Sequence, residues 1–147
     1  MTDKFIAKET KPKPTSEELI QYEKSTGFRL PEDYKDFLLN LNAYTIKNKF
    51  LDVDEILHVI HFFYPFTDGN LSLQKTNEIL KEMYEGKYII IASDEGGNSF
   101  GISLNDETYG IVYYLKADSH HTEFRRELAS SFSDMADKLS STDSFWI

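Results

Sequence analysis

The sequence contains one short motif that is typical of serine hydrolases. Residues 97–101 read G-N-S-F-G, which fits the G-x-S-x-G nucleophile elbow, and Asp118 is followed by His120 and His121 in the chain order of a catalytic triad. An elbow lies between a strand and a helix, however, whereas the residues after Ser99 alternate between polar and apolar as they do in a strand. We therefore expect a strand at this position and no catalytic serine.

Other residue types that carry chemistry lack the spacing that the chemistry needs. His58 and His61 are three positions apart, which on a strand places them on opposite faces, and His120 and His121 are adjacent in a polar stretch. Ser72 begins an S-x-x-K motif, but its K-T-G companion does not occur. Cysteine is absent, and neither GK[ST] nor G-x-G-x-x-G is present. We predict no catalytic residues, no metal site and no cofactor.

Three strands are predicted at the centre of the fold. Residues 88–92 form a short apolar run, residues 99–104 alternate between polar and apolar, and residues 110–115 are β-branched and aromatic. The breaks between them are rich in Gly, Asn and Asp, which tolerate the backbone angles of tight reversals. We expect these strands to form an antiparallel meander, which the β-rich segments 50–53 and 56–64 could join.

Helices are expected on four segments that flank the meander. Thr15 and Glu18 have the spacing of a capping box, and Gly27 would stop the helix that they open. In the second and fourth helices, large apolar residues recur at i, i+3, i+4 and i+7, which places them on one face. The expected helices cover residues 15–26, 31–41, 72–85 and 131–139.

The first fourteen residues differ in composition from the rest of the chain. They are polar and rich in lysine, and they contain Pro12 and Pro14. We expect residues 1–14 to form a flexible N-terminal tail and residues 15–147 to form one domain, since 147 residues is an ordinary length for a single domain. The combination of a meander with helices predicts the α+β class.

The overall charge is acidic, with 25 Asp and Glu residues against 16 Lys and Arg residues and a formal net charge of −9. Such a charge opposes binding to the phosphates of nucleic acids and attracts basic partners. The N-terminus lacks the apolar stretch of a secretory signal, and no segment approaches the roughly 20 apolar residues of a membrane span. We expect a cytoplasmic protein that binds neither nucleic acid nor membrane.

Four stretches of the chain follow one another as they do in a known family. They read FRLPEDYKDFLLNLN, ASDEGGNSFGISLN, GIVYYL and ELASSFSDMADKL, and together they resemble the SUKH superfamily, in particular its Smi/Knr-type branch. The resemblance extends from Thr15 to Leu139. One position departs from it, because Ala43 stands where the family often has glycine after asparagine. The matching positions are Leu30, Pro31, Asp33, Tyr34, Phe37, Leu38, Asn42, Ala92, Asp94, Gly97, Asn98, Val112, Tyr113, Tyr114, Ala129, Ser131 and Phe132.

The resemblance implies an α+β domain whose bent sheet, mixed or antiparallel, is flanked by helices. In bacteria it implies an immunity protein that binds and neutralises a cognate secreted toxin, often a nuclease or a deaminase. The family also includes fungal regulators of cell-wall signalling, which are interaction proteins, so a regulatory or scaffolding domain is the alternative. Neither branch implies catalytic residues, and a hydrolase that uses Ser99 is the third hypothesis.

The surface that would bind a toxin is predicted from charge and loop position. An acidic face could cover the basic cleft of the toxin and block its active site, because opposite potentials speed association and buried aromatic groups supply affinity. Tyr109 is the candidate aromatic anchor. The candidate partner-binding residues are Asp52, Asp54, Glu55, Asp94, Glu95, Asp106, Glu107 and Tyr109.

Overall fold

The computed structural model describes residues 2–67, 69–116 and 125–142 of the chain. Within these residues, four α-helices and ten strands in three sheets form an α+β fold, which confirms the predicted class. The helices are α1 (Ser16–Thr26), α2 (Glu32–Asn40), α3 (Leu73–Leu80) and α4 (Phe132–Lys138), with short 3-10 helices η1 (Thr2–Lys4), η2 (Gly69–Leu71) and η3 (Asp106–Thr108).

The largest sheet contains the predicted meander at its centre. Its strand order is β5-β6-β7-β8-β9, and every pair in it is antiparallel. All residues of β6 and β7 are buried, and a register shift between Ile90 and Ala92 makes a bulge in β6. The strands are β5 (Phe62–Phe63), β6 (Tyr88–Ser93), β7 (Ser99–Ser103), β8 (Val112–Leu115) and β9 (Arg125–Ala129).

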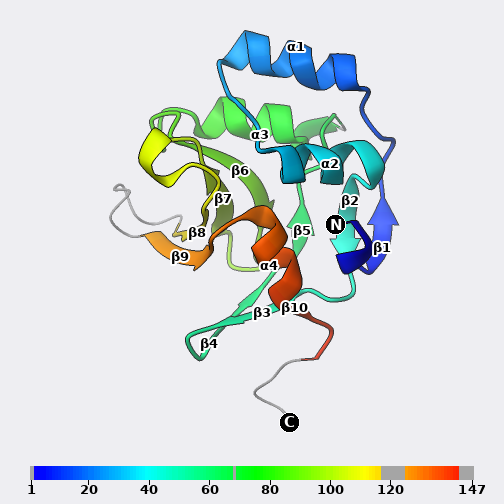
Figure 1. The fold of residues 1–147 in the computed structure, drawn as a ribbon, viewed down its shortest axis with the longest axis vertical. Helices are drawn as coiled ribbons and strands as arrows, with labels where there is room; N and C mark the ends of the chain where they lie inside the picture. Colours follow the sequence, from blue (N-terminus) through cyan, green and yellow to red (C-terminus); the bar gives the residue numbers. More distant parts are fainter. Residues whose placement is uncertain (1, 68, 117–124, 143–147) are drawn as a thin grey trace.

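Two further sheets lie outside the meander. β3 (Phe50–Val53) and β4 (Ile56–Val59) form a hairpin, and β10 (Leu139–Ser140) pairs with the other edge of β3. The sequence predicts that segments 50–53 and 56–64 could both join the meander. Only β5, at the end of the second segment, does so, because β3 and β4 pair with each other. In Figure 1, helices α1, α2 and α3 gather at one end of the molecule and the β3–β4 hairpin projects at the other.

The structure differs from the expected flexible tail over residues 1–14. β1 (Ala7–Thr10) pairs with β2 (Ala43–Ile46), and Phe5 is buried. The backbone on either side of Phe5 is fixed by the buried amide of Asn48, whose Oδ1 accepts from Ile6 N at 2.8 Å and whose Nδ2 donates to Lys4 O at 2.8 Å. Composition could not reveal this, because the partners lie more than 40 residues away.

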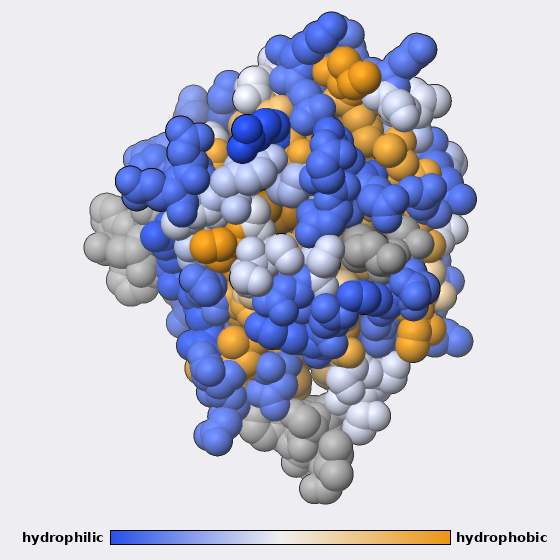
Figure 2. Space-filling model, in the orientation of Figure 1, coloured by the Kyte–Doolittle hydropathy of each residue, from blue (hydrophilic) through white to orange (hydrophobic). Residues whose placement is uncertain are grey.

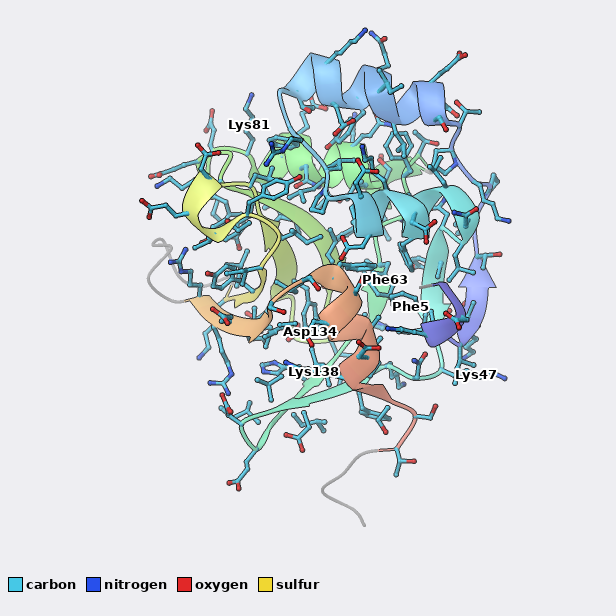
Figure 3. All side chains as sticks on the ribbon, viewed as in Figure 1. Phe5, Lys47, Phe63, Lys81, Asp134 and Lys138 are labelled. Atoms are coloured by element: carbon cyan, nitrogen blue, oxygen red, sulfur yellow. The ribbon has the colours of Figure 1, made fainter. Side chains whose placement is uncertain are left out.

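The core is built around aromatic rings contributed by segments that are far apart in the sequence. The Phe5 ring lies 4.8 Å from Phe37, 5.5 Å from Phe132 and 5.9 Å from Phe63, measured between centroids. Phe5 and Phe63 lie close together in Figure 3. Tyr34 packs edge-on against Phe132 at 5.2 Å. The predicted apolar faces of α2 and α4 therefore meet each other and the N-terminal segment in one cluster.

The helix ends confirm most of the predicted signals. The capping box of Thr15 and Glu18 is present, and Gly27 ends α1 with a left-handed φ of 78°. Ser131 caps α4 by accepting a hydrogen bond from Asp134 N. α3 is shorter than expected, since it ends at Leu80 and a turn follows, so that Met83 is 40% exposed and not inward-facing.

The amide of Asn77 on α3 takes the place of a neighbouring strand along β6. Its Oδ1 accepts from Ile90 N at 2.7 Å, and its Nδ2 donates to Ile90 O at 2.9 Å. β5 pairs with β6 only at Ala92 and Ser93, so the two polar groups of Ile90 would otherwise be buried without partners. Asn77 thereby fixes α3 to the central sheet.

Candidate interaction surface

The residues of the G-x-S-x-G motif form part of a strand. Ser99 opens β7, is 6% exposed and is followed by the rest of that strand, so the strand-to-helix turn that an elbow requires is replaced by continuous β-structure. Asp118, His120 and His121 lie outside the described residues. Ser72 of the S-x-x-K motif is the N-cap of α3, where its side chain accepts from Lys75 N at 3.1 Å.

The two remaining histidines have different environments. His58 is buried in β4, whereas His61 is exposed just before β5. In the part of the chain that the structure describes, no group of three or more His, Asp or Glu residues is arranged to hold a metal ion. No helix among the described residues is long and apolar enough to cross a membrane.

The predicted partner-binding residues divide between the two ends of the meander. Successive turns of an antiparallel meander lie at opposite ends of the sheet. The turn between β6 and β7 contains Asp94 and Glu95, and the turn between β7 and β8 contains η3 with Asp106 and Glu107. In Figure 1 the yellow η3 segment lies near α3, far from the β3–β4 hairpin. The eight residues therefore do not form one face.

The β3–β4 hairpin lies against the end of the meander that carries Asp94. The Arg126 Nη2 of β9 donates to Val53 O at 2.8 Å and lies 3.7 Å from Asp54 Oδ2. The His58 ring lies 4.6 Å from the ring of Tyr114, measured between centroids. We name this region the hairpin end, defined by Asp52, Asp54, Glu55, Ile56, Asp94 and Glu95.

Asp94 is held by the turn in which it lies. Its Oδ1 accepts from Gly96 N at 2.9 Å and from Asn98 N at 2.8 Å, and its Oδ2 accepts from the Tyr114 hydroxyl at 2.5 Å. Burial, followed by this hydrogen bond to Asp94, raises the pKa of Tyr114 to about 12. Asp94 is thus a half-buried carboxylate that shapes the turn, while its neighbour Glu95 is exposed.

Two buried nitrogens beside the hairpin end have no hydrogen-bond partner among the described residues. They are His58 Nε2 and Arg126 Nε. Burial, and then the charge of Arg126, lower the pKa of His58, although Asp94 and Asp52 oppose this. The lowered pKa favours the neutral form of His58 at pH 7.

The opposite end of the meander is arranged differently. The Tyr109 hydroxyl donates to Arg29 O at 2.5 Å, and the Arg29 guanidinium carbon lies 4.2 Å above the Tyr109 ring. Tyr109 therefore ties η3 to the loop between α1 and α2 and is not a free anchor, while Asp106 and Glu107 are exposed. We name this region the η3 end, defined by Asp106, Glu107 and Tyr109.

One exposed apolar residue was not among the sequence predictions. Ile56 follows the hairpin turn and is 47% exposed. It shares a strand face with His58 and Ile60, which are buried, so periodicity alone predicts an inward side chain. Figure 2 shows a mainly hydrophilic face on which apolar residues are scattered, so no large apolar patch marks a site on that face.

Two hollows flank α1. One of about 260 Å³ lies between α1 and α3, lined partly by Tyr22, Phe28 and Glu78, and one of about 290 Å³ lies between α1 and α2. Burial raises the pKa of Tyr22 to about 12, which leaves it protonated and unsuited to act as a base at neutral pH.

The matching positions of the resemblance carry structural roles. Asp33 on α2 accepts from Ser133 N at 2.9 Å and from Ser133 Oγ at 3.0 Å, which joins α2 to the start of α4. Asn42 adopts a left-handed φ of 47° and bonds Pro12 O and Phe66 N. Because the asparagine itself takes the left-handed conformation, Ala43 can begin β2 where glycine is often found.

Comparison with known proteins gives two findings. The family model described as SMI1 / KNR4 family (SUKH-1) matches residues 13–138. A curated relative, the SPbeta prophage-derived uncharacterized protein YokK of Bacillus subtilis (strain 168), is 26% identical in an alignment that covers 85% of this chain and 74% of the relative.

Proposed function

Because the chain belongs to the SMI1 / KNR4 family (SUKH-1), we propose that it is an immunity protein that binds and neutralises a cognate bacterial toxin. The family match over residues 13–138 is the observation that carries this proposal, since the SUKH family is known for immunity proteins. The prophage origin of the Bacillus subtilis relative supports a bacterial setting. The protein would act in the cytoplasm, where the toxin must be stopped.

The charge of the chain supports a basic toxin of the nuclease kind. A nuclease needs a positive cleft for the phosphate backbone of its substrate. A protein with a net charge of −9 is attracted to such a cleft, and opposite potentials raise the rate of association. The proposed mechanism is occlusion, in which the acidic protein covers the active cleft and excludes the nucleic acid.

The described side chains favour binding over catalysis. Ser99 is buried within a strand, and the best-formed polar contacts, such as that between Asp33 and Ser133, join elements of the fold. The alternative is a regulatory or scaffolding domain without a toxin partner. It would use the same exposed loops, since it too acts by binding proteins.

A co-expression experiment tests this proposal. The toxic domain encoded beside the gene is induced in a sensitive host with and without this protein, and the complex is isolated by affinity purification. Restored growth with a one-to-one complex is expected. Failure of both would contradict the proposal and favour the regulatory alternative, and labelling of Ser99 by a fluorophosphonate probe would instead indicate a hydrolase.

A further inference from the structure

We infer that the toxin docks on the hairpin end and not on the η3 end. The occupant is a basic protein surface with an apolar hollow that receives Ile56. This inference rests on the proposed function and selects one of the two acidic regions as its binding surface. Four features of the described residues carry it.

The first feature is charge. The hairpin end carries five carboxylates: Asp52 on β3, Asp54 and Glu55 in the hairpin turn, and Asp94 and Glu95 in the turn between β6 and β7. Its basic neighbours on the described strands are Arg126, which bonds Val53 O and pairs with Asp54, and Lys116, which follows β8. Arg125 is engaged elsewhere, since it donates to the Tyr88 hydroxyl and covers the Tyr113 ring.

The η3 end is more nearly balanced in charge. Arg29 covers Tyr109, and Lys87, whose backbone oxygen accepts from Leu104 N beside the turn, pairs with Glu85 at 2.9 Å. A basic partner that approaches this end meets bases as well as acids. The excess of negative charge therefore favours the hairpin end.

The second feature is a pair of unsatisfied buried groups. His58 is 6% exposed, its Nε2 has no partner among the described residues, and its ring packs 4.6 Å from that of Tyr114, whose hydroxyl donates to Asp94. Arg126 Nε is likewise buried without a partner. Buried polar groups in folded proteins are nearly always hydrogen-bonded, so two exceptions in one contact need a reason. Both atoms are inaccessible in the free protein, so a partner completes them only if docking shifts the hairpin against β9.

The third feature is the backbone of the hairpin turn. Asp54 and Glu55 have left-handed φ angles of 52° and 67°. A two-residue hairpin turn of this kind favours Asn-Gly or Asp-Gly, because Asn and Asp tolerate a left-handed φ and glycine adopts it without steric cost. Asp54 therefore suits its position, whereas Glu55 places an exposed carboxylate where the turn favours glycine. Such strain persists where function selects the residues.

The fourth feature is the exposed Ile56 next to these carboxylates. Interfaces obtain most of their affinity from a few apolar or aromatic anchors that a polar rim encloses. Ile56 at 47% exposure, with Asp54 and Glu55 before it in the chain, has that arrangement. The outer side of α3 also exposes Ile79, but acids and bases alternate there, with Lys75 and Glu78 as its exposed neighbours, so that surface selects no partner.

The test compares variants that remove equal charge from the two ends. The double variant Asp54→Asn, Glu55→Gly removes two carboxylates and supplies the residues that the turn favours, so it should fold at least as well as the wild type. The matched control, Asp106→Asn with Glu107→Gln, removes two carboxylates from the η3 end. A third variant, Ile56→Ser, removes the apolar anchor of the hairpin end. Its matched control, Ile79→Ser, removes the exposed isoleucine of α3.

Affinity is measured by calorimetry against a catalytically inactive form of the toxic domain encoded beside the gene. The hairpin double variant and Ile56→Ser should each weaken binding by about tenfold or more, because central contacts of an interface dominate affinity. The η3 control and Ile79→Ser should stay within about twofold, as peripheral residues do.

Two results would overturn the inference, and they are distinguishable. If the wild type binds and the η3 control or Ile79→Ser loses affinity while the hairpin variants do not, the docking surface is wrong and the proposed function stands. If the wild type binds no toxin and gives no protection, the proposed function fails and the inference fails with it.

Discussion

The contact between α2 and α4 and the contact between the β3–β4 hairpin and β9 both join distant parts of the chain. At the first, Asp33 accepts two hydrogen bonds from Ser133, and the rings of Tyr34 and Phe132 pack at 5.2 Å. At the second, Arg126 bonds Val53 O, but Arg126 Nε and His58 Nε2 are buried without partners.

This difference distinguishes the α2–α4 contact, which holds the fold together, from the hairpin contact, which lies at the proposed binding surface. The α2–α4 contact contains positions that match the family motifs, and its polar groups are paired. The hairpin contact contains none of those positions on β3 and β4, and it combines unpaired nitrogens, a strained turn and an exposed isoleucine. The motif positions at the α2–α4 contact therefore serve the fold, whereas the proposed docking surface combines one motif position, Asp94, with residues of the hairpin that lie outside the motifs.

The largest difference between the two contacts should appear when an apolar side chain is removed. Phe132→Ala should lower the free energy of unfolding by about 3–5 kcal/mol, because a fully buried ring leaves a cavity. Ile56→Ala should lower it by less than about 1 kcal/mol, since the side chain is half exposed. Urea denaturation measures both. Equal losses would mean that Ile56 belongs to the core.

Removal of one carboxylate from each contact gives the next largest effect. Asp33→Ala leaves Ser133 N and Ser133 Oγ without their acceptor, and we expect a loss of about 2–3 kcal/mol in urea denaturation. Asp54→Asn removes an exposed pair with Arg126 and keeps a residue type that tolerates the left-handed φ of 52°, so it should change the stability by less than about 0.5 kcal/mol. A loss for Asp54→Asn that matches Asp33→Ala would contradict the distinction between the contacts.

The pH dependence of stability should report the unpaired histidine. Because the pKa of His58 in the folded protein is below its ordinary value of 6.5, the unfolded chain binds more protons just below pH 6.5. The contribution of His58 to the free energy of unfolding is therefore fully present above about pH 6.5, and it is lost as the pH falls toward the lower pKa of the folded protein.

The variant His58→Phe isolates this effect. It should remove this part of the loss of stability below about pH 6.5, and it should raise stability at pH 7 by about 1 kcal/mol, because a buried nitrogen without a partner disappears. His61→Phe is the matched control, since His61 is exposed. Thermal unfolding between pH 5 and pH 8 measures the stability of both variants. If the stability of His58→Phe falls with pH as steeply as that of the wild type, His58 does not cause the loss below pH 6.5.

The smallest expected effect is a gain in stability at the turn. Glu55→Gly relieves a left-handed φ of 67° and should raise the free energy of unfolding by up to about 1 kcal/mol. Glu107→Gly in η3 is the control and should not stabilise, because no left-handed angle occurs there. A destabilised Glu55→Gly protein would show that the turn is not strained.

The sequence predicts the elements whose signals are local. The capping box of Thr15, the stop at Gly27 and the strand after Ser99 each depend on neighbouring residues, and all three are found. The order of Phe5 and its strand could not be predicted, because Asn48 and the aromatic core fix it from far along the chain.

The candidate surface was only partly predictable. The predicted meander already implies that Asp94 and Asp106 lie at opposite ends, but charge and loop position grouped them together. The approach of the hairpin to β9 could not be foreseen, since Arg126 reaches Val53 across 73 positions. The exposure of Ile56 could not be foreseen either. His58 and Ile60, which share its strand face, are buried, whereas Ile56 lies at the tip of the hairpin and is exposed.

Hydrogen–deuterium exchange of the protein with and without the inactive toxic domain tests the central claim most directly. We predict slower exchange on binding at residues 50–59 and 94–98, with no change at residues 104–110 or in α2 and α4. Protection of residues 104–110 with an unchanged hairpin would contradict the claim that recognition lies at the hairpin end.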